Sequence, residues 1–95
     1  MEITSVNHIC FSVSDLNTSI QFYKDILHGD LLVSGRTTAY LTIGHTWIAL
    51  NQEKNIPRNE ISHSYTHIAF SIDEEDFQQW IQWLKENQEI GRAHV

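Results

Sequence analysis

The stretch His-Ile-Cys-Phe-Ser-Val at residues 8–13 returns as His-Ile-Ala-Phe-Ser-Ile at residues 67–72. Four of the six positions are identical, and the last differs only as Val and Ile do. Each copy is followed by acidic residues and then by a helix-like apolar pattern. A short match alone can arise by chance, but the shared downstream element favours a duplicated β-α unit.

Each copy alternates with period two, which predicts a strand with one apolar face and one small, polar face. A histidine opens the polar face each time, His8 in the first copy and His67 in the second. The apolar face needs a helix packed on it, whereas the polar face is available for a functional site. The apolar residues are Ile9, Phe11 and Val13, opposite His8, Cys10 and Ser12, and then Ile68, Phe70 and Ile72, opposite His67, Ala69 and Ser71.

A helix is predicted after each strand. Ser14 or Asp15 is a suitable N-cap for the first helix, and His28-Gly29 is predicted to end it, because glycine is favoured just past a helix. The second helix is predicted to begin near Asp73, where three further acids complement the helix dipole. The apolar stripes expected to be buried are Leu16, Ile20, Tyr23 and Leu27 in the first helix and Phe77, Trp80, Ile81 and Leu84 in the second.

Three more extended segments, about 30–34, 37–43 and 46–51, lie between the copies, with turns expected at Gly35-Arg36 and Gly44-His45. The fold class predicted is α+β, with paired βαβββ modules, the second incomplete after its helix. We expect a first module at 1–51, a connector at 52–64, and a β-α start of the second module at 65–88. Residues 89–95 do not continue the pattern and match the peptide that a sequencing adapter encodes, so we expect them to be a non-native tail.

Composition excludes several classes of function. The formal charge of −6 disfavours nucleic acid as a partner, because phosphate binding needs clustered Lys and Arg. No apolar run approaches the roughly 20 residues that a membrane span needs. The single cysteine, Cys10, fits a reducing compartment, and no leader pattern is present, so a cytoplasmic location is expected.

With a βαβββ repeat and a histidine at the start of each first strand, the chain resembles the vicinal oxygen chelate superfamily. This superfamily includes glyoxalase I, extradiol dioxygenases and bleomycin-resistance proteins. Within it, the chain is most similar to the fosfomycin thiol transferases of Gram-positive bacteria. The similarity runs over nearly all of residues 5–88. The motifs that carry it are Asn-His-Ile-Cys-Phe-Ser-Val (7–13), Thr-Ala-Tyr-Leu (38–41), Trp-Ile-Ala-Leu-Asn (47–51), Ile-Pro-Arg-Asn-Glu-Ile (56–61) and Ser-Tyr-Thr-His-Ile-Ala-Phe (64–70).

The resemblance implies a reaction and a metal site. A thiol, bacillithiol or L-cysteine, would add to the epoxide of fosfomycin at a divalent metal, Mn²⁺ or Mg²⁺. His8 and His67 match the two histidine ligands. The third ligand, a glutamate, and the residues that hold the phosphonate lie past residue 88 in the family pattern and are absent here. We therefore expect the chain to be inactive alone.

The resemblance also implies a substrate pocket and an assembly. The positions that match pocket residues are Cys10, Tyr40, Trp47, Asn51 and Tyr65. Three have a simpler interpretation: Cys10 as a small buried residue, and Tyr40 and Trp47 as core. Because superfamily sites are often built across two chains, we expect the intact protein to be a homodimer.

Two other functions stay open from the sequence. One is a metal-free protein that sequesters an antibiotic, and the other is a different metalloenzyme of the superfamily, such as a glyoxalase or a dioxygenase. The histidine pair argues against the first, because the sequestering members lack it. The connector and the Ser-Tyr-Thr-His run favour the transferase over the second, by resemblance.

Overall fold

The computed structural model describes residues 1–58 and 67–87. The chain forms two compact units that divide after Ile56. Within the described residues, no helix has both the length and the apolar character needed to cross a bilayer.

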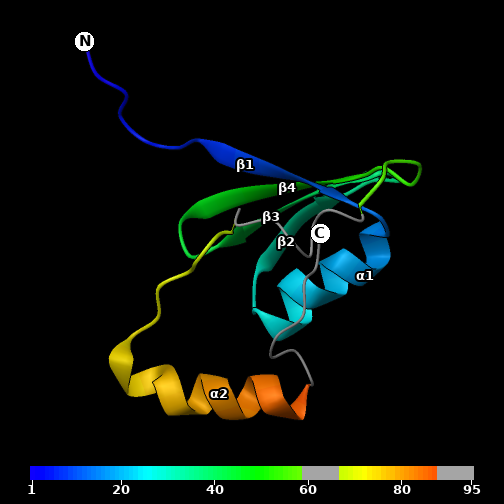
Figure 1. The fold of residues 1–95 in the computed structure, drawn as a ribbon. Coiled ribbons are helices and arrows are strands. Elements are labelled where there is room, and N and C mark those ends of the chain that lie inside the picture. Colours follow the sequence, from blue (N-terminus) through cyan, green and yellow to red (C-terminus); the bar gives the residue numbers. More distant parts are fainter. Residues whose placement is uncertain (59–66, 88–95) are drawn as a thin grey trace. The chain divides into compact units, whose positions relative to one another are not determined.

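The first unit is a four-stranded mixed sheet with helical cover (Figure 1). Its strands lie in the order β1-β4-β3-β2, with β1 parallel to β4 and the other neighbours antiparallel. The strands follow the predicted segments to within a residue or two, and the β-α-β-β-β order is confirmed, so this unit has the α+β architecture expected. Their bounds are β1 (His8–Val13), β2 (Asp30–Ser34), β3 (Thr38–Ile43) and β4 (Thr46–Gln52).

Two side chains begin the first helix, α1 (Leu16–Gln21). The Asp15 Oδ1 accepts a hydrogen bond from the Thr18 backbone N–H at 3.0 Å, which makes Asp15 the N-cap. The Gln52 Oε1 accepts a second bond from the Leu16 N–H at 2.9 Å. The helix then widens into a π-helical turn, η1 (Phe22–Ile26). Together α1 and η1 cover the length predicted for one helix.

The helix ends at the predicted place, and His28 and Gly29 have different roles there. His28, and not Gly29, adopts the left-handed conformation, with φ of 61°. Gly29 is needed for space instead, because a Cβ there would lie 2.8 Å from the Tyr23 carbonyl oxygen. The Gly29 N–H donates to that same oxygen at 2.8 Å, so the two backbones meet closely. The prediction that His28-Gly29 ends the helix is therefore confirmed, with His28 as the left-handed residue.

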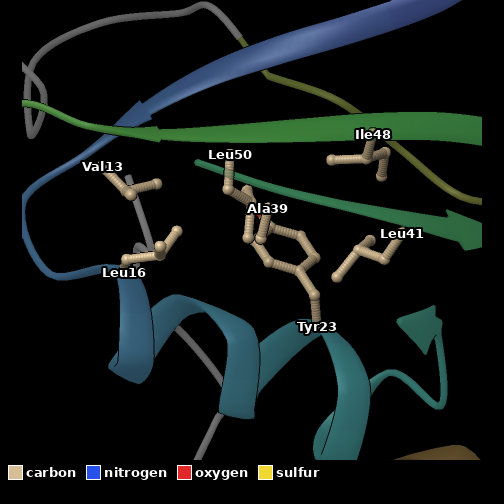
Figure 2. Close-up of a cluster of buried hydrophobic side chains, with 7 residues drawn as sticks. All are labelled: Val13, Leu16, Tyr23, Ala39, Leu41, Ile48 and Leu50. Atoms are coloured by element: carbon tan, nitrogen blue, oxygen red, sulfur yellow. The ribbon is translucent and has the colours of Figure 1, made fainter. Parts of the chain in front are cut away.

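The core lies between the sheet and the α1–η1 segment (Figure 2). The Tyr23 ring rises from the helical segment to the underside of β3 and β4 (Figure 2). Phe11 packs against this cluster and stacks on Tyr23 with ring centroids 6.0 Å apart. The predicted apolar face of the first strand is thus confirmed. The core residues are Val13, Leu16, Tyr23, Ala39, Leu41, Ile48 and Leu50.

The second unit is helical where it is described. A 3-10 turn, η3 (Glu74–Asp76), leads into α2 (Phe77–Glu86), so the predicted helix is confirmed. No residue of α2 is buried, and Phe77 is 50% exposed. The apolar stripe predicted to be buried is thus not covered in the described part of this unit, as expected of a helix without a sheet to pack on. Residues 67–72 form no strand, contrary to prediction. A strand needs a neighbour to receive its hydrogen bonds, and no strand of this unit is present among its described residues.

Candidate functional site

The candidate site is the face of the sheet opposite α1. Because side chains alternate along a strand, burying Val13, Leu41 and Ile48 on the helix side sends their neighbours to the other side. The register aligns these neighbours in rows that run across three strands. The rows are His8–Trp47–Thr42, Cys10–Ala49–Tyr40 and Ser12–Asn51–Thr38.

His8 opens β1 on this face and is exposed. Its Nδ1 lies 2.8 Å from the Asn7 Oδ1. In register, His8 lies beside Trp47 of β4, and neighbouring strands are about 4.8 Å apart. The predicted metal-ligating histidine of the first module is therefore on the polar face, as expected, with a second polar group beside its ring.

Two aromatic rings form the middle of the face. Tyr40 and Trp47 have ring centroids 6.2 Å apart and planes inclined by 44°. They stay 38% and 47% exposed, so the interpretation of either as a core residue is wrong. Cys10 is an exposed free thiol in the row that ends at Tyr40, so it is not a buried small residue. The face thus combines an imidazole, a thiol and an aromatic surface.

Asn51 lies at the far end of the face from His8. The Thr38 hydroxyl donates to the Asn51 Oδ1 at 3.2 Å, across β3 and β4. Thr38 and Thr42 were not predicted as members of this face. Their even spacing around Tyr40 is the signal that could have identified them, since positions 38, 40 and 42 share one side of a strand.

The structure brings together five of the seven predicted site residues, namely His8, Cys10, Tyr40, Trp47 and Asn51. His67 is exposed and belongs to the second unit, and Tyr65 lies outside the described residues. Among residues 1–58 and 67–87, no group of three or more His, Cys, Asp or Glu side chains could hold a metal ion. The predicted pairing of His8 with His67 on one cation therefore stays a prediction.

The donor chemistry of His8 fits a divalent metal. A ligating imidazole usually donates its second ring N–H to an oxygen, which fixes the tautomer and the ring orientation. The Asn7 amide oxygen lies in hydrogen-bond reach of Nδ1, so Nε2 is the ring nitrogen that would be available to a metal. Imidazole nitrogen is a ligand that Zn²⁺, Ni²⁺ and, with carboxylates, Mn²⁺ accept.

Comparisons with known proteins find one family model and several close relatives. The model of the Glyoxalase/Bleomycin resistance protein/Dioxygenase superfamily matches residues 5–93. A metallothiol transferase FosB from Staphylococcus epidermidis is 98% identical over 88 residues, which cover 93% of this chain and 62% of that protein. A second FosB from Staphylococcus epidermidis is 58% identical over 86 residues, covering 90% of this chain and 62% of its own length.

A solved structure shows the same fold. The fosfomycin resistance protein FosX from Mesorhizobium loti superposes with a TM-score of 0.71 at 29% identity, covering 90% of this chain and 68% of that one. The chain spans about three fifths of the length of the two curated relatives, at 62% of each.

Proposed function

Because this chain belongs to the Glyoxalase/Bleomycin resistance protein/Dioxygenase superfamily, we propose that it forms part of a metal-dependent thiol transferase that opens the epoxide of fosfomycin. The names of the relatives, metallothiol transferase and fosfomycin resistance protein, support the reaction and the substrate. The observation that carries the proposal is the position of His8, at the head of an open sheet face with its Nδ1 engaged and its Nε2 left to bind.

The metal site is proposed from the two copies of the repeated hexapeptide. His8 and His67 would be two ligands of a divalent cation, Mn²⁺ or Mg²⁺, since both histidines begin the repeated hexapeptide. When bound, such a cation supplies Lewis acidity at the epoxide oxygen. The thiol would be bacillithiol or L-cysteine. Its sulfur forms the new C–S bond, the epoxide C–O bond breaks, and the resulting alkoxide takes up a proton.

The rest of the face would hold the substrate. Tyr40 and Trp47 give a rigid aromatic surface that can displace water from the small epoxide carbon skeleton. Cys10 lies in the row between His8 and Asn51 and would form part of the pocket wall. The Asn51 carbonyl is engaged by Thr38, which directs the Asn51 amide N–H donors elsewhere, where they could reach a phosphonate oxygen. Tyr65 is proposed for the pocket on resemblance.

A homodimer in the cytoplasm completes the proposal. β1 is an edge strand, paired only with β4 in the described sheet. An edge strand presents unpaired N–H and C=O groups that favour pairing with another strand. Size-exclusion chromatography with light scattering on the full-length relative that is 98% identical tests whether the protein is a dimer.

The reaction is tested by mass spectrometry. The chain and its 98% identical relative are each incubated with fosfomycin, Mn²⁺ and either L-cysteine or bacillithiol. We expect a thiol adduct from the relative that EDTA abolishes, and little or none from the chain alone. His8→Ala in the relative should lower the rate by more than the roughly 100-fold that loss of an outer-shell partner costs. His45→Ala, at an exposed turn, is the matched control and should keep the rate. No adduct from either protein with either thiol would remove the proposal.

A further inference from the structure

Asn7 and His8 form a side-chain pair that depends on where β1 begins. Adjacent residues within a strand point to opposite faces. Asn7 precedes the first residue of β1, so its side chain is not held to that alternation and turns to the His8 ring. The Asn7 Oδ1 and the His8 Nδ1 lie 2.8 Å apart, a good length for an N–H···O bond.

The pairing selects one tautomer of His8. An amide oxygen only accepts hydrogen bonds, so with Oδ1 facing the ring this bond forms only when the proton of the neutral ring is on Nδ1. The lone pair is then on Nε2. A histidine in water prefers the other tautomer, with its proton on Nε2. The contact with Asn7 therefore reverses the ordinary preference and leaves Nε2 as the basic atom.

We propose that Asn7 is a positioning residue that holds His8 with its Nε2 lone pair ready for a divalent cation. The inference rests on the proposed function for the cation, but the tautomer itself is a property of the metal-free chain. Asn7 acts in two ways: it places the proton, and it restricts ring rotation. Both effects mean that the His8 ring needs less change of tautomer and orientation when a cation binds.

The tautomer is tested by NMR on the metal-free chain. Long-range ¹H–¹⁵N spectra separate protonated from unprotonated ring nitrogens, and the His8→Gln variant assigns the signals. In the unmodified chain at a pH where the ring is neutral, we expect His8 to have a protonated Nδ1 and an unprotonated Nε2. Asn7→Ala should return His8 to the Nε2–H tautomer, whereas Asn7→Asp, which keeps an acceptor oxygen, should retain Nδ1–H.

Asn17→Ala is the matched control, an exposed asparagine on α1. It should leave the His8 spectrum unchanged. Because Asn7 is exposed and lies outside the sheet, its variants should keep the dispersed spectrum of the folded chain. A folded, unmodified chain in which His8 is protonated on Nε2 overturns the inference, since the amide would then be donating its N–H to Nδ1.

Cation binding is tested with Mn²⁺ alone. Paramagnetic broadening of the His8 ring protons is followed during titration of the unmodified chain and of Asn7→Ala. We expect about tenfold weaker binding in Asn7→Ala, the lower end of what outer-shell partners contribute. An equal response of the two proteins, including no response from either, overturns the positioning role. Failure of the fosfomycin assay would remove the proposed function and leave the tautomer result standing, so the two failures are distinguishable.

Discussion

The rings of Tyr40 and Trp47 contact each other diagonally across β3 and β4, with centroids 6.2 Å apart. Tyr40 is paired in register with Ala49, and Trp47 with Thr42, so the small Ala49 leaves room for the two rings to meet. Both rings remain more than a third exposed. Because the two rings are partly exposed to solvent, they add little buried apolar area to the core. Their position therefore favours a role in binding.

The first prediction concerns this pair. A double-mutant cycle with Tyr40→Ala and Trp47→Ala should give a coupling of about 0.5–1 kcal/mol in the free energy of unfolding, because aromatic pairs interact beyond their buried area. Urea denaturation followed by circular dichroism measures it. Tyr40→Ala combined with Asp25→Ala, on the helical side, should be additive. Additivity of the aromatic pair as well would contradict the contact.

The second prediction concerns the link between β4 and α1. The Gln52 Oε1 accepts from the Leu16 N–H at 2.9 Å, so one side chain joins the end of a strand to the start of the helix. Gln52→Ala should lower the free energy of unfolding by about 0.5–1.5 kcal/mol. Gln52→Glu keeps the oxygen and adds a favourable charge near the helix N-terminus, so it should retain most of the stability. Equal losses in the two variants, measured by denaturation, would show that the acceptor oxygen is not what matters.

The third prediction is a pH dependence at Asp15. The hydrogen bond from the Thr18 backbone N–H lowers the pKa of Asp15 below its ordinary value of 3.8. The folded state therefore favours the carboxylate, so its contribution is present above the unfolded pKa and is lost as the pH falls through the lower folded pKa. Asp15→Ala should reduce the melting temperature at pH 7, and this difference should shrink at pH values well below 3.8.

The control for Asp15 removes a charge from the same helical segment without removing a cap. Asp25 is exposed and lies in η1, so Asp25→Ala changes the net charge by the same amount. Its melting temperature should stay close to that of the unmodified chain at pH 7. A difference for Asp15→Ala that persists unchanged into acid would mean that the charge of the cap has no role.

Much of the first unit could be predicted from local patterns. Period-two alternation placed His8 and Cys10 opposite Phe11 and Val13, because one face of the sheet has to be buried. The N-cap was predicted as Ser14 or Asp15 from their short acceptor side chains, and the structure has Asp15. The end of the helix was harder to predict. The need for a small residue at Gly29 comes from the close backbone of Tyr23 and from Ile43, which is distant in sequence, and the sequence pattern shows neither contact.

The candidate site was predictable only in part for the same reason. Each residue could be assigned to a face, but the neighbours on that face depend on strand order and register. Thr38 joins the site through its bond to Asn51, and the two are 13 positions apart. At residues 67–72 the sequence pattern clearly predicts a strand, but none forms. A strand needs a partner strand to receive its hydrogen bonds, and the local pattern does not show whether one is present.

The fourth prediction compares two glycines that are needed for different reasons. Gly44 has φ of +59°, and a Cβ added there would meet no other atom within 4 Å, so Gly44→Ala meets only conformational strain, about 1–2 kcal/mol. At Gly29 an added Cβ would lie 2.8 Å from a backbone oxygen and 3.1 Å from an Ile43 methylene, so the chain itself must move. Gly29→Ala should therefore cost more than Gly44→Ala in urea denaturation. Gly35→Ala, with only a 3.4 Å contact, is the control and should cost least.

The fifth prediction concerns the ring that joins the helix to the sheet. Tyr23 is 6% exposed, and burial raises the pKa of its phenol above the ordinary value of 10.0. Tyr23→Ala should cost about 3–5 kcal/mol, as for other large core rings. Because native domains are stable by only about 5–15 kcal/mol, this loss is a large share of the total and should lower the midpoint of urea denaturation strongly. Tyr23→Phe keeps the ring and should stay folded at neutral pH.

The same residue predicts the response to alkali. The folded state favours the neutral phenol, so its contribution is complete below the unfolded pKa of about 10 and is lost as the pH rises towards the raised folded value. The unmodified chain should therefore lose stability faster than Tyr23→Phe as the pH rises above about 10. Thermal melts of both proteins from pH 8 upward measure the difference in their melting temperatures. The other titrating groups are the same in both proteins, so their effects cancel in this difference. Parallel curves for the two proteins would mean that the Tyr23 hydroxyl is solvated in the folded state and that burial does not hold it neutral.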